Sequence, residues 1–497
     1  MTKMWRKVLS SPMLVLALCL PPATAFANVD ACSPTKPKPK NTNVKIPDVG
    51  KPRTPASGVA NGWVLLYDDS GFTQLSDEVY CSGNRIRFAS SDGEKNFQKH
   101  PNCKKTTCTK AVETGKVTKV VLKGTSGNTN TFLWSSDFAG FYVFHDFTGP
   151  TSDGATPDAP LLRDVAGNLY GTTLLGGVSS SYGTVFKIDT SGKETVLYNF
   201  TGGADGGYPY GGLVQDSTGN LYGTTAAGGS TGNGTVFKLD TSNVETVLHS
   251  FSGPDGAYPV GGLVRDSSGN FYGTTEIGGS GGNGTVFKLD PTNTLTTLYN
   301  FTGGSDGGYP LDETLIIDGS GNLYGTTNLG GSTGNGTVFK LDTSNVETVL
   351  HSFAGGSTDG CHAYGDAAMD ASGNLYGTTR DCGSGNAGIV WKVDTTGTEV
   401  VLYNFSGGAD GGSPLAGVIL DRSGNLYGVT LGGGAGNAGT LFQVSGTTET
   451  VLRSFSPSTD GANPIGGLIF DADGNIYGTA NNGGSSNYGT VWGFDLK

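Results

Sequence analysis

The sequence predicts an all-β protein whose larger part is a seven-bladed β-propeller, and three observations predict it. The phrase Gly-Asn-Leu-Tyr-Gly-Thr-Thr recurs seven times with small changes, at steps of 50 to 52 residues, near the length of one four-stranded blade. Glycine is abundant, at 84 of 497 residues, and 10% of the chain is aromatic, as short strands joined by tight turns require. The repeated tyrosines are Tyr170, Tyr222, Tyr272, Tyr324, Tyr376, Tyr427 and Tyr477.

The first 27 residues have the layout of a secretory signal peptide. Lys3, Arg6 and Lys7 precede an apolar run at 13–20, and residues 25–27 read Ala-Phe-Ala, a small-x-small cleavage site. The apolar run is too short to cross a bilayer, and no later run is long enough. The chain is therefore predicted to be secreted, to a periplasmic or extracellular location, without a membrane span.

Residues 28–140 do not repeat. The stretch 28–60 is rich in proline and lysine and is predicted to be an extended linker. Strand-like runs and three cysteines at 61–140 predict a small disulfide-stapled β module, because an even number of cysteines in an exported chain favours disulfides. The sequence does not determine how the four cysteines of residues 28–140 pair: Cys32, Cys81, Cys103 and Cys108.

The propeller is predicted to span residues 141–497. In the third copy, four short runs are expected to form strands A to D, at 261–265, 271–276, 285–289 and 296–301. The last copy stops after its third strand, whereas 141–147 matches a fourth strand and precedes the first copy. We therefore expect this segment to close the ring as the outer strand of the last blade, which removes exposed sheet edges.

This closure fixes the two faces of the ring. Strand A is expected to line the channel, the D–A and B–C loops to share one face, and the A–B and C–D turns to share the other. Cys361 lies in a D–A loop and Cys382 in the B–C loop of the same fifth blade, so a disulfide between them is predicted.

Charge is divided unevenly along the chain. Residues 28–140 hold 16 lysines and arginines against 10 acids, whereas residues 141–497 hold 12 against 33. The acidic propeller argues against nucleic acid as a ligand. The basic segment could attract the propeller or face an anionic partner.

Two aspartates recur in every copy. The set that begins the A–B turns is expected to accept turn amides: Asp164, Asp216, Asp266, Asp318, Asp370, Asp421 and Asp471. The other set precedes glycine in the D–A loops: Asp153, Asp205, Asp255, Asp306, Asp359, Asp410 and Asp460. Seven carboxylates round one mouth could bind a cation such as calcium, but Asp-Gly is a common turn dipeptide and the structural interpretation is favoured. No cofactor is predicted.

The repeat is broken in blades four and five. Most copies begin strand A with small residues, as in Gly211-Gly212, and here they are replaced by polar side chains that the topology places on one face. They could form an off-centre pocket at the channel mouth that captures a ligand or performs acid–base chemistry. The alternative is divergence in an exposed loop. The candidate residues are Asp312, Glu313, His362, Asp366, Arg380 and Asp381.

The repeat resembles the GloVer tandem repeat of bacterial secreted and surface proteins. The residues that carry the resemblance in the second copy are Gly212-Leu213-Val214, Asp216, 219–225 and 234–238. The resemblance implies export and a C-terminal surface anchor, but the chain ends Asp495-Leu496-Lys497 with no sorting signal. It offers no catalytic residues to transfer.

We therefore expect a monomeric extracellular binding or scaffold propeller that recognises a glycan, a cell-envelope component or a protein through its D–A/B–C face. The rival hypothesis is a carbohydrate lyase or hydrolase that uses the cluster in blades four and five. A third is a structural protein stabilised by calcium.

Overall fold

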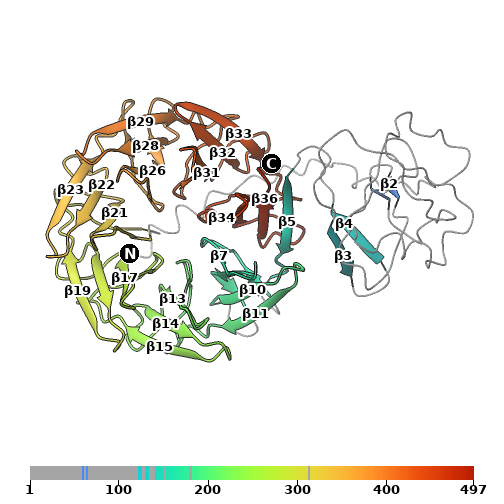
Figure 1. Ribbon diagram of the computed structural model, residues 1–497, viewed down its shortest axis with the longest axis horizontal. Coiled ribbons are helices and arrows are strands. Elements are labelled where there is room, and N and C mark those ends of the chain that lie inside the picture. Colours follow the sequence, from blue (N-terminus) through green and yellow to red (C-terminus); the bar gives the residue numbers. More distant parts are fainter. Residues whose placement is uncertain are drawn as a thin grey trace, which may run out of the picture. The chain divides into compact units, whose positions relative to one another are not determined.

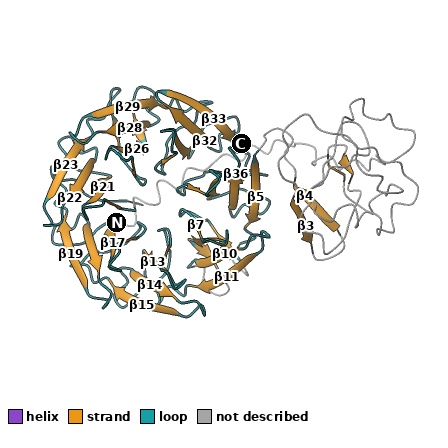
Figure 2. Cartoon of the chain, viewed as in Figure 1, coloured by secondary structure: helices purple, strands orange, loops and turns teal. Residues whose placement is uncertain are grey.

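The propeller is a ring of seven four-stranded antiparallel sheets (Figure 1). The computed structural model describes residues 140–149, 153–177, 182–311 and 314–496 in full. Within these ranges the chain forms strands and loops and no helix (Figure 2). The predicted all-β, seven-bladed architecture is confirmed.

Each blade runs outward from the axis as strands A, B, C and D. The A strands are β7 (Leu162–Arg163), β12 (Val214–Gln215), β16 (Val264–Arg265), β20 (Ile316–Ile317), β25 (Ala368–Met369), β30 (Ile419–Leu420) and β34 (Ile469–Phe470). The B strands are β8 (Leu169–Thr173), β13 (Leu221–Thr225), β17 (Phe271–Thr275), β21 (Leu323–Thr327), β26 (Leu375–Thr379), β31 (Leu426–Thr430) and β35 (Ile476–Ala480).

The C strands are β10 (Thr184–Ile188), β14 (Thr235–Leu239), β18 (Thr285–Leu289), β22 (Thr337–Leu341), β28 (Ile389–Val393), β32 (Thr440–Ser445) and β36 (Thr490–Phe494). The D strands are β11 (Glu194–Asn199), β15 (Glu245–Ser250), β19 (Leu295–Asn300), β23 (Glu347–Ser352), β29 (Glu399–Asn404), β33 (Thr448–Ser454) and β5 (Phe141–Asp146). Two short loop ladders join β6 (Gly154–Ala155) to β9 (Leu175–Gly176) and β24 (Gly360–Cys361) to β27 (Asp381–Cys382).

The ring closes as the sequence predicted. Strand β5, from before the first copy, pairs with β36 of the last, so that Asp146 lies opposite Thr490 and Val143 opposite Trp492. Phe141 stacks on Trp492 with ring centroids 5.5 Å apart. The outer edge of the last blade is therefore covered by the start of the propeller.

Strand A is shorter than expected. In the third blade the ladder covers only Val264–Arg265, not the five residues predicted from 261 onward. The preceding glycines run close to the neighbouring blades, since a Cβ on Gly211 would clash with the carbonyl of Gly261 and one on Gly262 would meet Thr314. Crowding at the axis, not strand pairing, explains the small residues at this position.

Aromatic pairs between blades form the core. Phe200 follows strand D of the first blade and meets Phe237 of the second edge to face, with centroids 5.1 Å apart. The glycine of the repeated phrase makes room for this ring, because a Cβ on Gly223 would lie 2.8 Å from Phe237. Both phenylalanines are fully buried, which stabilises each blade interface by about 1.5–3 kcal/mol per side chain.

The A–B turns explain the rest of the phrase. One carboxylate oxygen of Asp216 accepts hydrogen bonds from the backbone of Thr218 and Asn220, at 2.9 and 3.0 Å. The other accepts from the Asn220 amide at 2.8 Å and the Tyr222 hydroxyl at 2.9 Å. All seven copies make this Asp–Asn–Tyr clamp. The structural role predicted for these aspartates is therefore observed.

The chain divides into two units between residues 139 and 140. In the first unit β1 (Val59–Ala60) pairs with β2 (Trp63–Val64), and β3 (Val121–Thr125) pairs with β4 (Thr129–Leu133). The predicted disulfides of this unit fall on cysteines outside the described residues. Among the described residues, no helix is long and apolar enough to cross a membrane.

Candidate functional site

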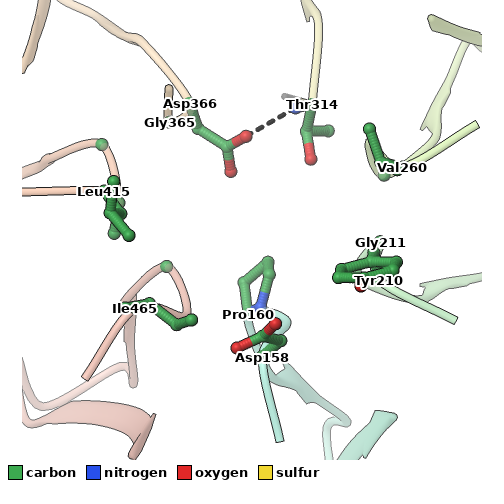
Figure 3. Close-up of a pocket in the computed structure, with 15 residues that line it drawn as sticks. Asp158, Pro160, Tyr210, Gly211, Val260, Thr314, Gly365, Asp366, Leu415 and Ile465 are labelled. Carbon is green, nitrogen blue, oxygen red and sulfur yellow. Dashed lines mark hydrogen bonds between the residues drawn. The ribbon is translucent and has the colours of Figure 1, made fainter. Parts of the chain in front are cut away.

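A hollow open to solvent lies at the axis where the A strands begin. Every blade contributes to its lining, and Figure 3 shows the side chains converging on it. Because these residues directly follow the D–A loops, the hollow lies toward the D–A/B–C face. One lining residue from each blade in turn is Asp158, Tyr210, Val260, Thr314, Asp366, Leu415 and Ile465.

Two carboxylates face each other across the hollow (Figure 3). Asp158 of the first blade accepts a 2.5 Å hydrogen bond from the Asn481 side chain, and Asp366 of the fifth accepts one of 2.5 Å from the Thr314 backbone. Burial raises the pKa of Asp158 to about 7 and that of Asp366 to about 6. Both can therefore exchange a proton near neutral pH, which is what a general acid or a hydroxyl-binding group needs.

A closed polar network occupies the loops of blade five. His362 Nδ1 lies 3.1 Å from Asp381 Oδ2, and Arg380 Nε donates to the same oxygen at 2.7 Å. The Arg380 guanidinium also donates to the Tyr364 hydroxyl and lies 5.1 Å from that ring's centroid. Burial opposes ionisation of Asp381, but these hydrogen bonds from His362 and Arg380 outweigh it and lower its pKa.

Of the six residues predicted to form one pocket, the four that the structure describes do not lie together in one site. His362, Arg380 and Asp381 contact one another but do not line the axial hollow, whereas Asp366 lines it and faces Asp158 instead. Asp366 lies two residues before β25 and reaches the axial hollow, whereas the other three lie in the D–A and B–C loops. Two of the predicted residues, Asp312 and Glu313, lie outside the described residues.

The predicted disulfide between Cys361 and Cys382 is present, with Cα atoms 5.5 Å apart. It joins β24 to β27 and so ties the D–A loop of blade five to its B–C loop. The bond flanks the His362–Asp381 pair on both strands. It therefore holds this network in place without taking part in its chemistry.

An arc of tyrosines was missed by the sequence reasoning. Tyr208, Tyr258 and Tyr309 occupy one repeat position in the D–A loops of blades two to four, and His362 follows in blade five. All four have positive φ, between 56° and 60°. Their backbone amides donate to the preceding blade, as Tyr258 does to Asn233 at 2.9 Å, so the loops are locked. The signal was the recurring Tyr-Pro dipeptide.

The three tyrosine rings differ in how far they are exposed to solvent and so to a ligand. Tyr258 is 41% exposed, and Tyr208, which packs against Tyr182 with centroids 5.3 Å apart, is half-buried like Tyr309. The left-handed backbone recurs at this position in all seven blades, so it belongs to the loop, and the bulky ring is what blades two to four add to it.

The aspartates of the D–A loops do not line the hollow. Asp205 accepts from the Tyr198 hydroxyl at 3.1 Å and from the Thr201 backbone at 2.8 Å. Each of the other six likewise binds a side chain of the outer strand before it. They lie beside the outer strands and brace the D–A loops, so they do not form a ring of carboxylates around the hollow.

The profile of the Gloeobacter/Verrucomicrobia repeat matches residues 110–315 and 312–497, so the chain belongs to that family. No curated protein matches the chain. Solved structures match the chain at low similarity. A gluconolactonase from Xanthomonas campestris is 12% identical with a TM-score of 0.40, over 72% of this chain and 89% of that one. The extracellular domain of a candidate one-component system from B. thetaiotaomicron is 11% identical with a TM-score of 0.43, over 70% and 40%.

Proposed function

We propose that this member of the Gloeobacter/Verrucomicrobia repeat family is an exported, non-catalytic propeller that binds a glycan on its D–A/B–C face. The observation that carries the proposal is the recurrence of Tyr208, Tyr258 and Tyr309 at one position of the D–A loops, on the face toward which the axial hollow lies. Export rests on the signal-peptide layout of residues 1–27.

The chemistry of the face fits a sugar. A tyrosine ring offers an apolar surface to the C–H face of a pyranose, while its hydroxyl stays in contact with water. Asp158 and Asp366 can accept hydrogen bonds from sugar hydroxyls or, when protonated, donate one. Beside these two carboxyl groups the hollow offers the apolar side chains of Val260, Leu415 and Ile465, which can contact the C–H groups of a ligand.

A glycan array with the purified full chain tests the proposal. We expect binding to a restricted set of glycans, at least tenfold weaker in the Tyr258→Ala/Asp366→Asn double variant. Val346→Ala is the control, because Val346 is 57% exposed in a C–D turn on the opposite face. Binding that survives the double change, or binding only to proteins or cell-envelope fragments without sugar, would contradict the proposal.

A second candidate is hydrolysis or elimination on the same ligand. It is favoured by two carboxyl groups with pKa values of about 7 and about 6 in one hollow, a pairing that acid–base catalysis uses. This moves the enzymatic alternative from the blade-five loops to Asp158 and Asp366. Release of cleaved sugar by the wild-type chain and not by Asp158→Asn would establish it.

A further inference from the structure

Seven equivalent sites, here called rim stations, lie between neighbouring blades beside the outer strands. Each combines a side chain from one outer strand, the aspartate of the following D–A loop, and a residue near the start of the next outer strand. In chain order they are His145/Asp153/Glu194, Tyr198/Asp205/Glu245, His249/Asp255/Leu295, Tyr299/Asp306/Glu347, His351/Asp359/Glu399, Tyr403/Asp410/Glu449 and Arg453/Asp460/Phe141.

Two stations hold three metal-ligating side chains. In His145/Asp153/Glu194 and His351/Asp359/Glu399, one ligand atom from each residue lies within 4.8 Å of the others. The histidine Nε2 to aspartate Oδ2 distances are 3.1 and 3.3 Å. The Oε1 atoms of Glu194 and Glu399 are buried and have no hydrogen-bond partner among the described residues.

These distances suit a small divalent ion. Zinc binds histidine nitrogen and carboxylate oxygen at about 2.0–2.2 Å, so two ligands of a tetrahedral ion lie about 3.3 Å apart. The histidine and aspartate therefore already have the spacing of neighbouring ligands. A small movement of the glutamate completes three ligands, and water can take the fourth place.

The aspartates are held ready for this role. Asp153 accepts the backbone N–H groups of Thr148 at 2.9 Å and Gly154 at 2.7 Å, and Asp359 accepts those of Ala354 and Gly360, both at 2.6 Å. Such outer hydrogen bonds fix a ligating carboxylate and raise metal affinity. The carboxylates are nearly buried, at 8% and 9% exposure, which limits competition from water.

The other five stations each lack at least one ligand and serve as controls within the chain. Three have tyrosine in place of histidine, and one has Leu295 in place of glutamate. At the last, Arg453 pairs with Asp460 and lies over the Phe141 ring, leaving no free ligand set. The complete set is therefore confined to two stations.

We propose that these two rim stations bind one divalent transition-metal ion each, of the Zn²⁺ type, and that the ions clamp blade seven to blade one and blade four to blade five. The first junction is the closure of the ring, where β5 meets the first copy. An ion that binds only the folded ring stabilises it by mass action.

Zinc titration by calorimetry on the chelator-treated full chain tests the proposal, with metal content counted by mass spectrometry. We expect His145→Tyr and His351→Tyr each to lose one zinc equivalent and the double variant to lose two. Tyrosine occupies this position at three other stations, so these variants should melt as the wild type does without metal. Zinc bound elsewhere on the chain is present in the wild type and in the variants, so it cancels when their stoichiometries are subtracted.

His249→Tyr is the matched control, because its station has histidine and aspartate but lacks the glutamate. It should lose no equivalent, whereas Glu194→Leu, which copies that station, should lose one. Zinc should also raise the melting temperature of the wild type more than that of the double variant. Equal zinc uptake by the wild type and the double variant, or an equal loss in His249→Tyr, would overturn the proposal.

Discussion

The A–B turns and the channel mouth are built from the same repeat but differ in what the copies keep. In the turns, all seven blades have the same Asp–Asn–Tyr clamp, as Asp216, Asn220 and Tyr222 show. At the mouth, one repeat position carries Asp158 in the first blade and Val260 in the third. A side chain required by every blade serves the fold, whereas a position free to differ can serve a ligand.

The largest effect should come from the repeated core. Phe237→Ala removes a fully buried ring that packs on Phe200, and it should lower the free energy of unfolding by about 3–5 kcal/mol. Urea denaturation measures this change. A loss below about 1 kcal/mol would show that the blade interface tolerates the cavity. The repeated core would then be no more important for stability than the variable channel mouth.

The next effect concerns the one buried ion pair of the rim stations. Arg453 donates to Asp460 at 2.9 Å and lies 4.7 Å from the Phe141 ring centroid, so it links blade six to the closing strand. Arg453→Met should lower the free energy of unfolding by about 3 kcal/mol, because Asp460 is left buried without its charge partner. Arg453→Tyr, which restores the hydroxyl donor of other stations, should recover part of it. Equal losses in the two variants would contradict this explanation.

A smaller effect is expected from one turn clamp. Asp216→Asn retains the shape but removes the charge that four donors approach, so the free energy of unfolding should fall by about 1–2 kcal/mol. The equivalent variants Asp266→Asn and Asp318→Asn should lose a similar free energy of unfolding when measured by denaturation. If the loss in the free energy of unfolding differed tenfold among these blades, the turns would not be equivalent.

The stability of the ring should also fall as pH rises through neutrality. At three stations the pKa of the glutamate is raised from 4.5 to about 7. Burial is the larger cause, and the charge of the neighbouring aspartate is the second. A raised acid pKa in the fold favours the protonated form, so this stability is present below pH 4.5 and lost as pH rises toward 7. The pairs are Glu245 with Asp205, Glu347 with Asp306 and Glu449 with Asp410, each beside a tyrosine: Tyr198, Tyr299 and Tyr403.

Thermal melting between pH 4.5 and pH 8 measures this dependence. A Glu245→Gln/Glu347→Gln/Glu449→Gln variant stays uncharged at all three stations, so its melting temperature should fall less over this range than that of the wild type. Parallel curves for the two proteins would rule the three glutamates out as the cause.

The repeat made most of the fold predictable. Seven copies, a missing last strand and a spare one at 141–147 were enough to predict the blades and their closure, and the loop topology predicted the Cys361–Cys382 bond. Strand A was predicted too long, because composition alone does not show how closely the blades approach at the axis.

The site was harder to predict, for two physical reasons. Asp158 stands where other copies have Tyr210 or Val260, but it is a single charged departure from the repeat, whereas blades four and five depart from it at several positions. The rim stations join residues such as His145 and Glu194 from neighbouring blades. Their proximity depends on how blades pack, which no spacing in the sequence reveals.

The central contrast, between aspartates that build the fold and aspartates that serve the surface, is tested most directly by one paired measurement. Asp216→Asn and Asp366→Asn are compared for the free energy of unfolding at pH 8 and for glycan binding. Asp216→Asn should lose about 1–2 kcal/mol and bind normally. Asp366→Asn should be as stable as the wild type or more so, because its buried charge disfavours the fold above pH 6, and should bind poorly. Destabilisation of Asp366→Asn with binding intact would contradict the assignment of the channel mouth as the functional surface.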